Sequence, residues 1–270
     1  YIMNFILIDG SYYCFYRYYA ILNWFKLAHK DVDLSVPIEN EDFVEKFKKT
    51  FVSKIKEIPK KLKIDNPTIY VGKDCSRKDI WRKTHDKNYK ATRVYDDSFM
   101  GGPFFKLAYD ELFKSSGIPD KYILYKNKLE ADDCIAIMAK KLIEKDPNNT
   151  VTVITSDTDY LQLIQPGITL YSLKLKPVRT EKNSTGCAEQ DLFYKIILGD
   201  KSDNIPKVFK KCGKKTVEKF WNDKVLLEAQ FDKEPGSRDK FNHNKKLIDF
   251  NMIPMDLQEA FIEEHKNLII

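Results

Sequence analysis

Short apolar runs alternate with amphipathic stretches along the chain, and this alternation is the clearest structural signal in the sequence. Runs of β-type residues, each with a polar turn nearby, predict strands at 4–8, 68–71, 122–125 and 151–154, with 170–175 as a further candidate. An aromatic or aliphatic residue recurs every fourth position from Phe43 to Ile55, which predicts an amphipathic helix ending near Pro59. Strands that alternate with helices favour an α/β fold with a mostly parallel central sheet flanked by helices.

The pattern changes near residue 185. Upstream of it, strands and helices alternate; downstream, the chain is helical and partly rich in lysine. No internal repeat and no long linker separates the two parts. We therefore expect an α/β core over residues 3–185 with an attached helical subdomain over 186–270.

The composition is that of an ordinary globular protein. Of the 270 residues, 43% are hydrophobic and 32% are charged, which excludes a collagen-like or wholly disordered chain. The apolar run at 5–8 is far shorter than the ~20 residues of a membrane span, and no secretory pattern follows it. Five widely spaced cysteines without a Cys-x-x-Cys motif argue against a zinc cage and fit a reducing compartment. We expect a cytoplasmic protein with no membrane attachment.

Positive charge is concentrated in two windows. Residues 73–93 contain eight basic and three acidic residues, and residues 201–219 contain seven lysines and two acidic residues. Together these windows exceed the net charge of +6 for the whole chain, so the remainder is slightly acidic. Two basic patches beside acidic groups suit a polyanion held around a metal site. The alternative is a pair of solvated, lysine-rich helical faces.

Nine acidic residues stand where the expected fold would gather them. Four follow predicted strands, three begin a predicted helix and two are spaced three apart: Asp9, Asp74, Asp157 and Asp159; Glu130, Asp132 and Asp133; Asp200 and Asp203. Ligands of open α/β sheets bind beyond the carboxyl ends of the strands. Because like charges at ~4 Å repel by roughly 4 kcal/mol at an effective dielectric constant of ~20, such a cluster requires cations. Oxygen ligands without histidine or cysteine favour Mg²⁺ or Mn²⁺ over Zn²⁺.

Each acidic group also has a plain structural interpretation. Asp9 and Gly10 could form a simple turn, residues 130–133 a helix N-cap, and Asp157 with Asp159 an Asx turn. Taken singly, these explanations are preferable. Their common position at strand ends and helix starts favours the metal site.

Five motifs together resemble a known family, the 5′-nucleases that include flap endonucleases and the 5′-nuclease domains of bacterial DNA polymerases. They are Ile-Leu-Ile-Asp-Gly at 6–10, Tyr-Lys-Ala-Thr-Arg at 89–93, Glu-Ala-Asp-Asp at 130–133, Thr-Ser-Asp-Thr-Asp at 155–159 and Gly-Asp-Lys-Ser-Asp-Asn-Ile-Pro at 199–206. Order and spacing agree over nearly the whole chain. The stretches 74–93 and 246–250 resemble the phage ribonuclease H subgroup of this family.

The resemblance implies a PIN-like, Rossmann-like nuclease core and a two-metal phosphodiesterase that uses two Mg²⁺ ions, with Mn²⁺ as a substitute. It assigns the nine carboxylates to two sites: Asp9, Asp74, Glu130, Asp132 and Asp133 to the tighter site, and Asp157, Asp159, Asp200 and Asp203 to the second. It further implies that Lys90, Arg82 and Arg93 stabilise the charge of the phosphorane, and that Tyr89 stacks on a displaced base. The alternative for these four residues is a solvated basic surface that only attracts nucleic acid.

In the family, the segment that corresponds to about 77–100 forms a helical arch through which a single-stranded 5′ end passes. Here it combines rings with cations, including Lys83 and Lys87, and such a mixture suits a single strand. Its weak apolar periodicity suggests a segment that is disordered without DNA and orders on binding.

The window at about 200–220 resembles the helix–hairpin–helix of the family, which grips the duplex backbone. The residues concerned are Lys207, Lys210, Lys211, Gly213, Lys214 and Lys215. Lys207 stands where the family commonly has glycine, which argues for stronger salt dependence of binding and against a monovalent-cation site. A basic surface helix pair is the alternative.

The leading hypothesis is therefore a Mg²⁺-dependent 5′→3′ exonuclease and flap endonuclease. It would act as a monomer on DNA, RNA–DNA hybrids and 5′-flap or forked substrates, and remove RNA primers during replication. By resemblance, a single-strand-binding protein and a sliding clamp are expected partners. Two alternatives remain: a catalytically silent relative that binds branched nucleic acid, and a toxin-type ribonuclease.

Overall fold

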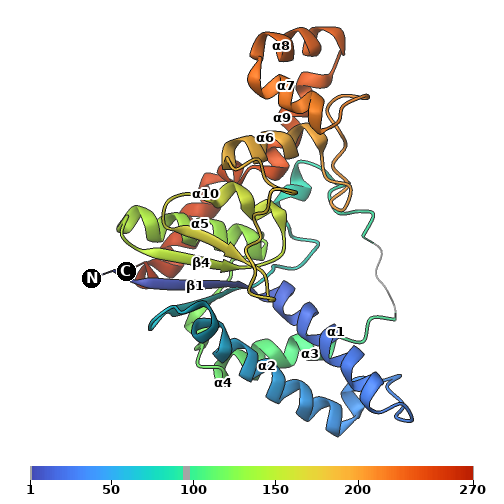
Figure 1. The fold of residues 1–270 in the computed structure, drawn as a ribbon, viewed down its shortest axis with the longest axis vertical. Helices are drawn as coiled ribbons and strands as arrows, with labels where there is room; N and C mark the ends of the chain where they lie inside the picture. Colours follow the sequence, from blue (N-terminus) through green and yellow to red (C-terminus); the bar gives the residue numbers. More distant parts are fainter. Residues whose placement is uncertain (1, 94–97, 270) are drawn as a thin grey trace.

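A five-stranded, entirely parallel sheet forms the centre of the molecule in the computed structural model, which describes residues 2–93 and 98–269 (Figure 1). Its strands are β1 (Asn4–Asp9), β2 (Thr68–Gly72), β3 (Ile123–Leu124), β4 (Thr150–Ile154) and β5 (Ile168–Tyr171), in the order β3-β2-β1-β4-β5. The first four strands lie where the hydrophobic pattern predicted them. The fifth begins and ends earlier than the predicted 170–175; Leu173 and Leu175 lie beyond its end and pack into the cluster under α1 and α2.

The ten α-helices within the described residues fall into three groups. They are α1 (Gly10–Ala28), α2 (Glu41–Leu62), α3 (Gly102–Leu107), α4 (Phe113–Ser115), α5 (Ala131–Lys145), α6 (Ala188–Leu198), α7 (Lys214–Asn222), α8 (Lys224–Lys233), α9 (Ser237–Ile248) and α10 (Met255–His265). Figure 1 shows α1 to α4 on one face of the sheet, α5 and α10 on the other, and α6 to α9 beyond its edge. No helix within 2–93 and 98–269 is long and apolar enough to cross a membrane.

The side-chain alternation of β1 divides the core in two. Phe5 and Leu7 pack into the cluster under α5 and α10, whereas Ile6 and Ile8 pack into the cluster under α1 and α2. A sheet buried on both faces is expected for a parallel arrangement with crossover helices. Helix α2 continues three residues beyond Pro59, contrary to the predicted end, and the buried Ile58 holds this last turn against the core.

The C-terminal residues belong to two packing units. Helices α6 to α8 share a cluster of their own around Phe209 and Phe220. From Phe250 onward the chain returns to the sheet, where Phe261 and Leu268 join the cluster under α5 and the Tyr70 hydroxyl donates to the Leu268 carbonyl at 2.8 Å. The sequence pattern predicts a helical subdomain over all of 186–270, but by packing residues 250–269 lie with the α/β core.

The basic segment, residues 77–93, lies on one side of the molecule (Figure 1). Within residues 77–93 it forms one short 3₁₀ turn, Trp81–Thr84, and otherwise turns and loops. Residues 94–97 of the expected arch lie outside the described residues. The following Phe99 stacks on Phe15 of α1 at 4.9 Å between ring centroids.

Candidate metal centre

Three parallel strands end at the same edge of the sheet and place acidic residues there. Asp9 is the last residue of β1 and pairs in register with Gly72 of β2, two residues before Asp74. On the other side, Ile8 pairs with Ile154 of β4, shortly before Asp157 and Asp159. The chain order reverses direction across the sheet at β1, and ligands of open α/β sheets bind at such a point.

The start of α5 is tied to this edge by a hydrogen bond. The Ala131 amide donates to Asp74 Oδ1 at 2.8 Å, so the first turn of the helix, with Asp132 and Asp133, faces the strand ends. Glu130 occupies the N-cap position and forms a capping box with Asp133. The structure thus brings the strand-end and helix-start acids together.

Position 10 requires glycine for this arrangement. A Cβ atom on Gly10 would lie 2.5 Å from the Gly72 carbonyl and 2.3 Å from the Tyr109 hydroxyl. Any side chain there would push β1 and β2 apart directly beside Asp9. The Asp-Gly pair is therefore more than a turn signal, because the glycine permits the close approach of the two strand ends.

Asp9 and Asp132 lie in surroundings that disfavour their charge. Asp9 accepts hydrogen bonds from the Tyr12 amide (3.0 Å) and the Tyr160 hydroxyl (3.1 Å). Burial and the neighbouring Asp74 nevertheless raise the pKa of Asp9 to about 7. Burial, followed by Asp133 and Glu130, raises the pKa of Asp132 well above its ordinary value. Both shifts indicate an excess of negative charge that a bound cation would relieve.

Arg82 and Asp133 form a buried ion pair behind this cluster. The guanidinium donates to both oxygens of Asp133 at 2.7 and 2.9 Å and to Glu130 at 2.9 Å, and its Nε donates to the Leu247 carbonyl at 2.7 Å. Trp81 Nε1 also donates to Asp133 at 2.9 Å. Arg82 is 1% exposed and Asp133 is 0% exposed. Although Glu130, Asp132 and Asp133 each have an oxygen within 4.8 Å of the others, both oxygens of Asp133 are engaged by Arg82.

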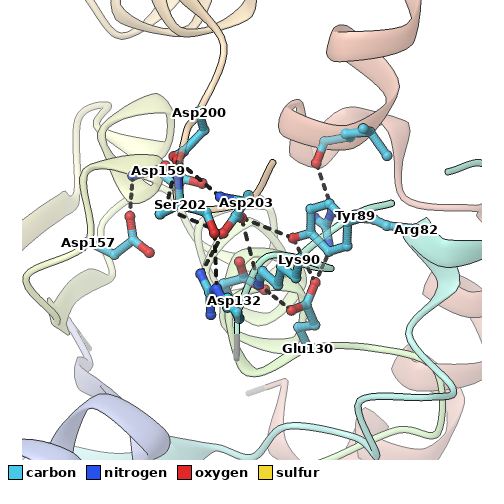
Figure 2. A network of polar contacts seen from close by, with 12 residues as sticks. Arg82, Tyr89, Lys90, Glu130, Asp132, Asp157, Asp159, Asp200, Ser202 and Asp203 are labelled. Atoms are coloured by element: carbon cyan, nitrogen blue, oxygen red, sulfur yellow. Dashed lines mark hydrogen bonds and ion pairs between the residues drawn. The ribbon is translucent and has the colours of Figure 1, made fainter. Parts of the chain in front are cut away.

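Tyr89 and Lys90 reach from the basic segment to Glu130 and Asp203 (Figure 2). Arg93 of the same segment reaches Asp203 as well. Lys90 Nζ lies 2.5 Å from Glu130 and 3.7 Å from Asp203, and Arg93 pairs with Asp203 at 2.5 Å. Burial alone would lower the pKa of Lys90, but the surrounding carboxylates raise it above its ordinary value. Lys90 and Arg93 therefore lie at the acidic cluster as cations.

Tyr89 is placed differently from the sequence-based expectation. Its ring is 2% exposed, and its hydroxyl donates towards Glu130 and Asp203 at 3.1 and 3.2 Å. In this conformation it presents no face to a nucleic-acid base. The burial follows from the apolar neighbours Ile80 and Ile205, which the polar pattern of residues 77–93 does not reveal.

Asp159 and Asp200 share a cation that the sequence analysis missed. Lys195, in the last turn of α6, pairs with Asp200 at 2.9 Å and with Asp159. Burial opposes ionisation of Asp200, but hydrogen bonds from Lys195 and Ser202 lower its pKa to about 2. The contact depends on the chain reversal at Gly199, whose φ is +68°, so no regular helical spacing links Lys195 to Asp200 in the sequence.

The hairpin lysines lie beyond this pair of acids. A groove of about 860 Å³ is lined by Asp159 and Asp200 and also by Lys201, Lys214 and Lys215. Gly213 is the N-cap of α7. The remaining expected nucleic-acid contacts are exposed or half-exposed: Lys83, Lys87, Lys207, Lys210 and Lys211. The groove thus joins the acidic cluster to the basic hairpin.

A sequence model of the 5′-3′ exonuclease N-terminal, resolvase-like domain matches residues 4–193. The chain therefore belongs to the 5′-3′ exonuclease family of nucleases, and the family resemblance noted in the sequence is confirmed. Among curated proteins, ribonuclease H of Enterobacteria phage T4 is 26% identical over 218 residues, which cover 72% of this chain and 68% of that protein. DNA polymerase I of Caldicellulosiruptor bescii is 30% identical over 159 residues, covering 54% of this chain but only 18% of the polymerase.

Two solved structures of phage T5 proteins share the fold over essentially their whole length. The T5 5′-exonuclease with bound zinc has a TM-score of 0.68 at 19% identity, covering 99% of this chain and 100% of that one. The T5 flap endonuclease in a complex with DNA and metal ions has a TM-score of 0.67 at 19% identity, covering 98% and 99%. This likeness confirms the predicted fold class.

Proposed function

We propose that this chain is a divalent-metal-dependent 5′→3′ exonuclease and flap endonuclease that acts on DNA and RNA–DNA hybrids. The observation that carries the proposal is the gathering of carboxylates from β1, β2, β4, α5 and the residues after α6 at one edge of the sheet. Removal of RNA primers during replication fits the likeness to a phage ribonuclease H. The same relative favours the cytoplasm of a bacterial host as the place of action.

The oxygen donors fit Mg²⁺ or Mn²⁺. Asp9, Asp74 and Asp132 would hold one ion beside Glu130, whose two oxygens accept from Lys90 and from Arg82 and Tyr89, and Asp157, Asp159, Asp200 and Asp203 would hold a second. A pair of such ions supplies an activated water and neutralises charge on the scissile phosphate. The T5 relatives have bound metal ions in their structures, which fits a metal-dependent activity.

Four residues of the basic segment would assist in different ways. Lys90 and Arg93 are the cations nearest to Glu130 and Asp203, and we assign them to stabilising charge that develops on the phosphate. Arg82 holds Asp133 and Glu130 in place and so acts through these carboxylates. Stacking of Tyr89 on a base requires that its hydroxyl leave Glu130 and Asp203 when substrate binds.

The decisive test is cleavage of a 5′-flap duplex labelled at either end, with Mg²⁺, with Mn²⁺ and with EDTA. We expect short 5′ products only in the presence of metal, and none from the Asp157→Asn variant, because it lacks one ligand of the second site. Exposed Asp31→Asn is the matched control and is expected to cut normally. Tight binding without any cut in Mg²⁺ or Mn²⁺ would favour the silent branched-nucleic-acid binder instead.

Removal of the two groove lysines Lys214 and Lys215 together, each to Ala, should weaken binding of a duplex without altering cleavage of bound substrate. Each lysine that contacts a phosphate contributes about 0.9 to the slope of log K against log salt, so the slope should fall by roughly 2. Fluorescence anisotropy across a salt series measures it. Exposed Lys49 and Lys56 of α2, changed in the same way, should leave the slope unchanged. An unaltered slope in the hairpin variant would exclude these lysines from the interface.

By family resemblance we further propose that the protein works as a monomer alongside a single-strand-binding protein and a sliding clamp.

A further inference from the structure

The acids of the cluster are not equally neutralised. Within the described residues, the ion pairs involve Glu130, Asp133, Asp159, Asp200 and Asp203. No ion pair in that part of the chain involves the other four, Asp9, Asp74, Asp132 and Asp157. Five of the nine acids are therefore already paired with a cation of the chain itself, and the two acids Asp159 and Asp200 of the expected second site share one such cation.

Lys195 supplies this charge where the second ion is expected. Its ammonium bridges Asp159 and Asp200, two acids that come from different segments of the chain. The lysine side chain is 18% exposed and contacts both Asp159 and Asp200, where two neighbouring carboxylates attract a cation. Asp159 and Asp200 would repel each other without it.

The surroundings allow the lysine to leave without disturbing the carboxylates. Asp200 Oδ1 accepts hydrogen bonds from the Ser202 amide and hydroxyl at 2.7 and 2.6 Å, so Lys195 pairs with the other oxygen. The groove of about 860 Å³ is lined by Asp159, Lys195 and Asp200 together, which leaves open space beside the lysine side chain. Asp200 thus stays oriented when Lys195 swings out.

We propose that Lys195 is a built-in placeholder for the second divalent ion: it neutralises Asp159 and Asp200 in the ion-free enzyme and withdraws into the groove when that ion binds. The proposal rests on the metal-dependent function proposed above. An ion that must displace an ammonium binds more weakly than an ion that meets bare carboxylates. The two ions therefore load in a fixed order, first at Asp9, Asp74 and Asp132 and then at Asp159 and Asp200.

The test is titration calorimetry of the full chain with MnCl₂ alone, without nucleic acid. We expect two classes of site in the wild type. Lys195→Met should tighten the weaker class by about tenfold or more, since it removes a like charge within contact distance, and should leave the tighter class unchanged. Lys195→Gln, which keeps a hydrogen-bond donor but no charge, should behave similarly, and Lys195→Arg should retain the weak second site. Lys201→Met, which removes a lysine lining the same groove, is the control and should change neither class by more than about twofold.

The outcomes separate the two proposals. If two ions bind and neither Lys195→Met nor Lys195→Gln changes their affinities, the placeholder role of Lys195 is excluded, whereas metal binding is confirmed. If Lys201→Met tightens the second site as much as Lys195→Met does, the effect is one of overall charge and the placeholder role falls as well. If neither the wild type nor any variant binds Mn²⁺, the proposed metal-dependent function is wrong, and Lys195 has no ion to replace. Circular dichroism melting of each variant confirms that the titrated protein is folded.

Discussion

Replacing Arg82 with Met should lower the free energy of unfolding by about 3–5 kcal/mol, because removing one partner of a buried ion pair leaves an uncompensated charge. Arg82 is 1% exposed and neutralises Asp133, which is 0% exposed, together with Glu130. The side chain also ties residues 81–82 to the Leu247 carbonyl at 2.7 Å.

Urea unfolding followed by circular dichroism measures this loss. Lys83→Met, which changes the neighbouring half-exposed lysine, should stay within about 0.5 kcal/mol of the wild type. The double variant Arg82→Met with Asp133→Asn should recover part of the loss, since the unpaired charge is gone while an acceptor for Trp81 remains. A loss below about 1 kcal/mol in Arg82→Met, or no recovery in the double variant, would contradict the structural role assigned to the pair.

Changing Asp9 to Asn should raise the stability of the metal-free protein above neutral pH and lower its activity. The pKa of Asp9 in the folded protein is raised from 3.8 to about 7, mainly by burial and then by Asp74. The stability contributed by its neutral form is therefore complete below pH 3.8 and is lost as the pH rises to about 7. Asparagine stays neutral, so without metal the variant should melt higher than the wild type at pH 8, by on the order of 5 °C, and equally near pH 4. Cleavage should fall by about 10³-fold or more, because a metal ligand is lost.

Thermal melting from pH 4 to 8.5, in EDTA and in MnCl₂, measures the stability effect. Mn²⁺ should raise the melting temperature of the wild type at pH 8 more than that of Asp9→Asn, since only the wild type has the charge that the ion relieves. Asp31→Asn, in an exposed loop, is the control for loss of one negative charge and should melt like the wild type. A variant that melts lower than the wild type at pH 8 in EDTA would show that Asp9 stabilises the ion-free fold instead.

The acidic residues at the strand ends were predictable from the sequence, but the residues that contact the acidic cluster from distant segments were not. An apolar run followed by Asp9 is a local pattern, and parallel strands carry such residues to one edge without further information. The positions of Arg82, Tyr89 and Lys195 depend on contacts between distant segments: Arg82 meets residues 48 and 51 positions away. Burial of a polar or aromatic residue by such contacts leaves no periodicity in the sequence. The return of residues 250–269 to the sheet escaped prediction for the same reason.

The core cluster under α5 includes Phe250, Phe261 and Leu268, and Arg82 is held by the Leu247 carbonyl. A ribosome adds these residues after it has made every strand of the sheet and every acidic residue of the cluster. Because domains fold as units during synthesis, the nascent chain carries the acids but lacks the packing that fixes Arg82 and Asp133 behind them. The packing behind the acidic cluster is thus completed late in translation, after the hairpin helices have been made.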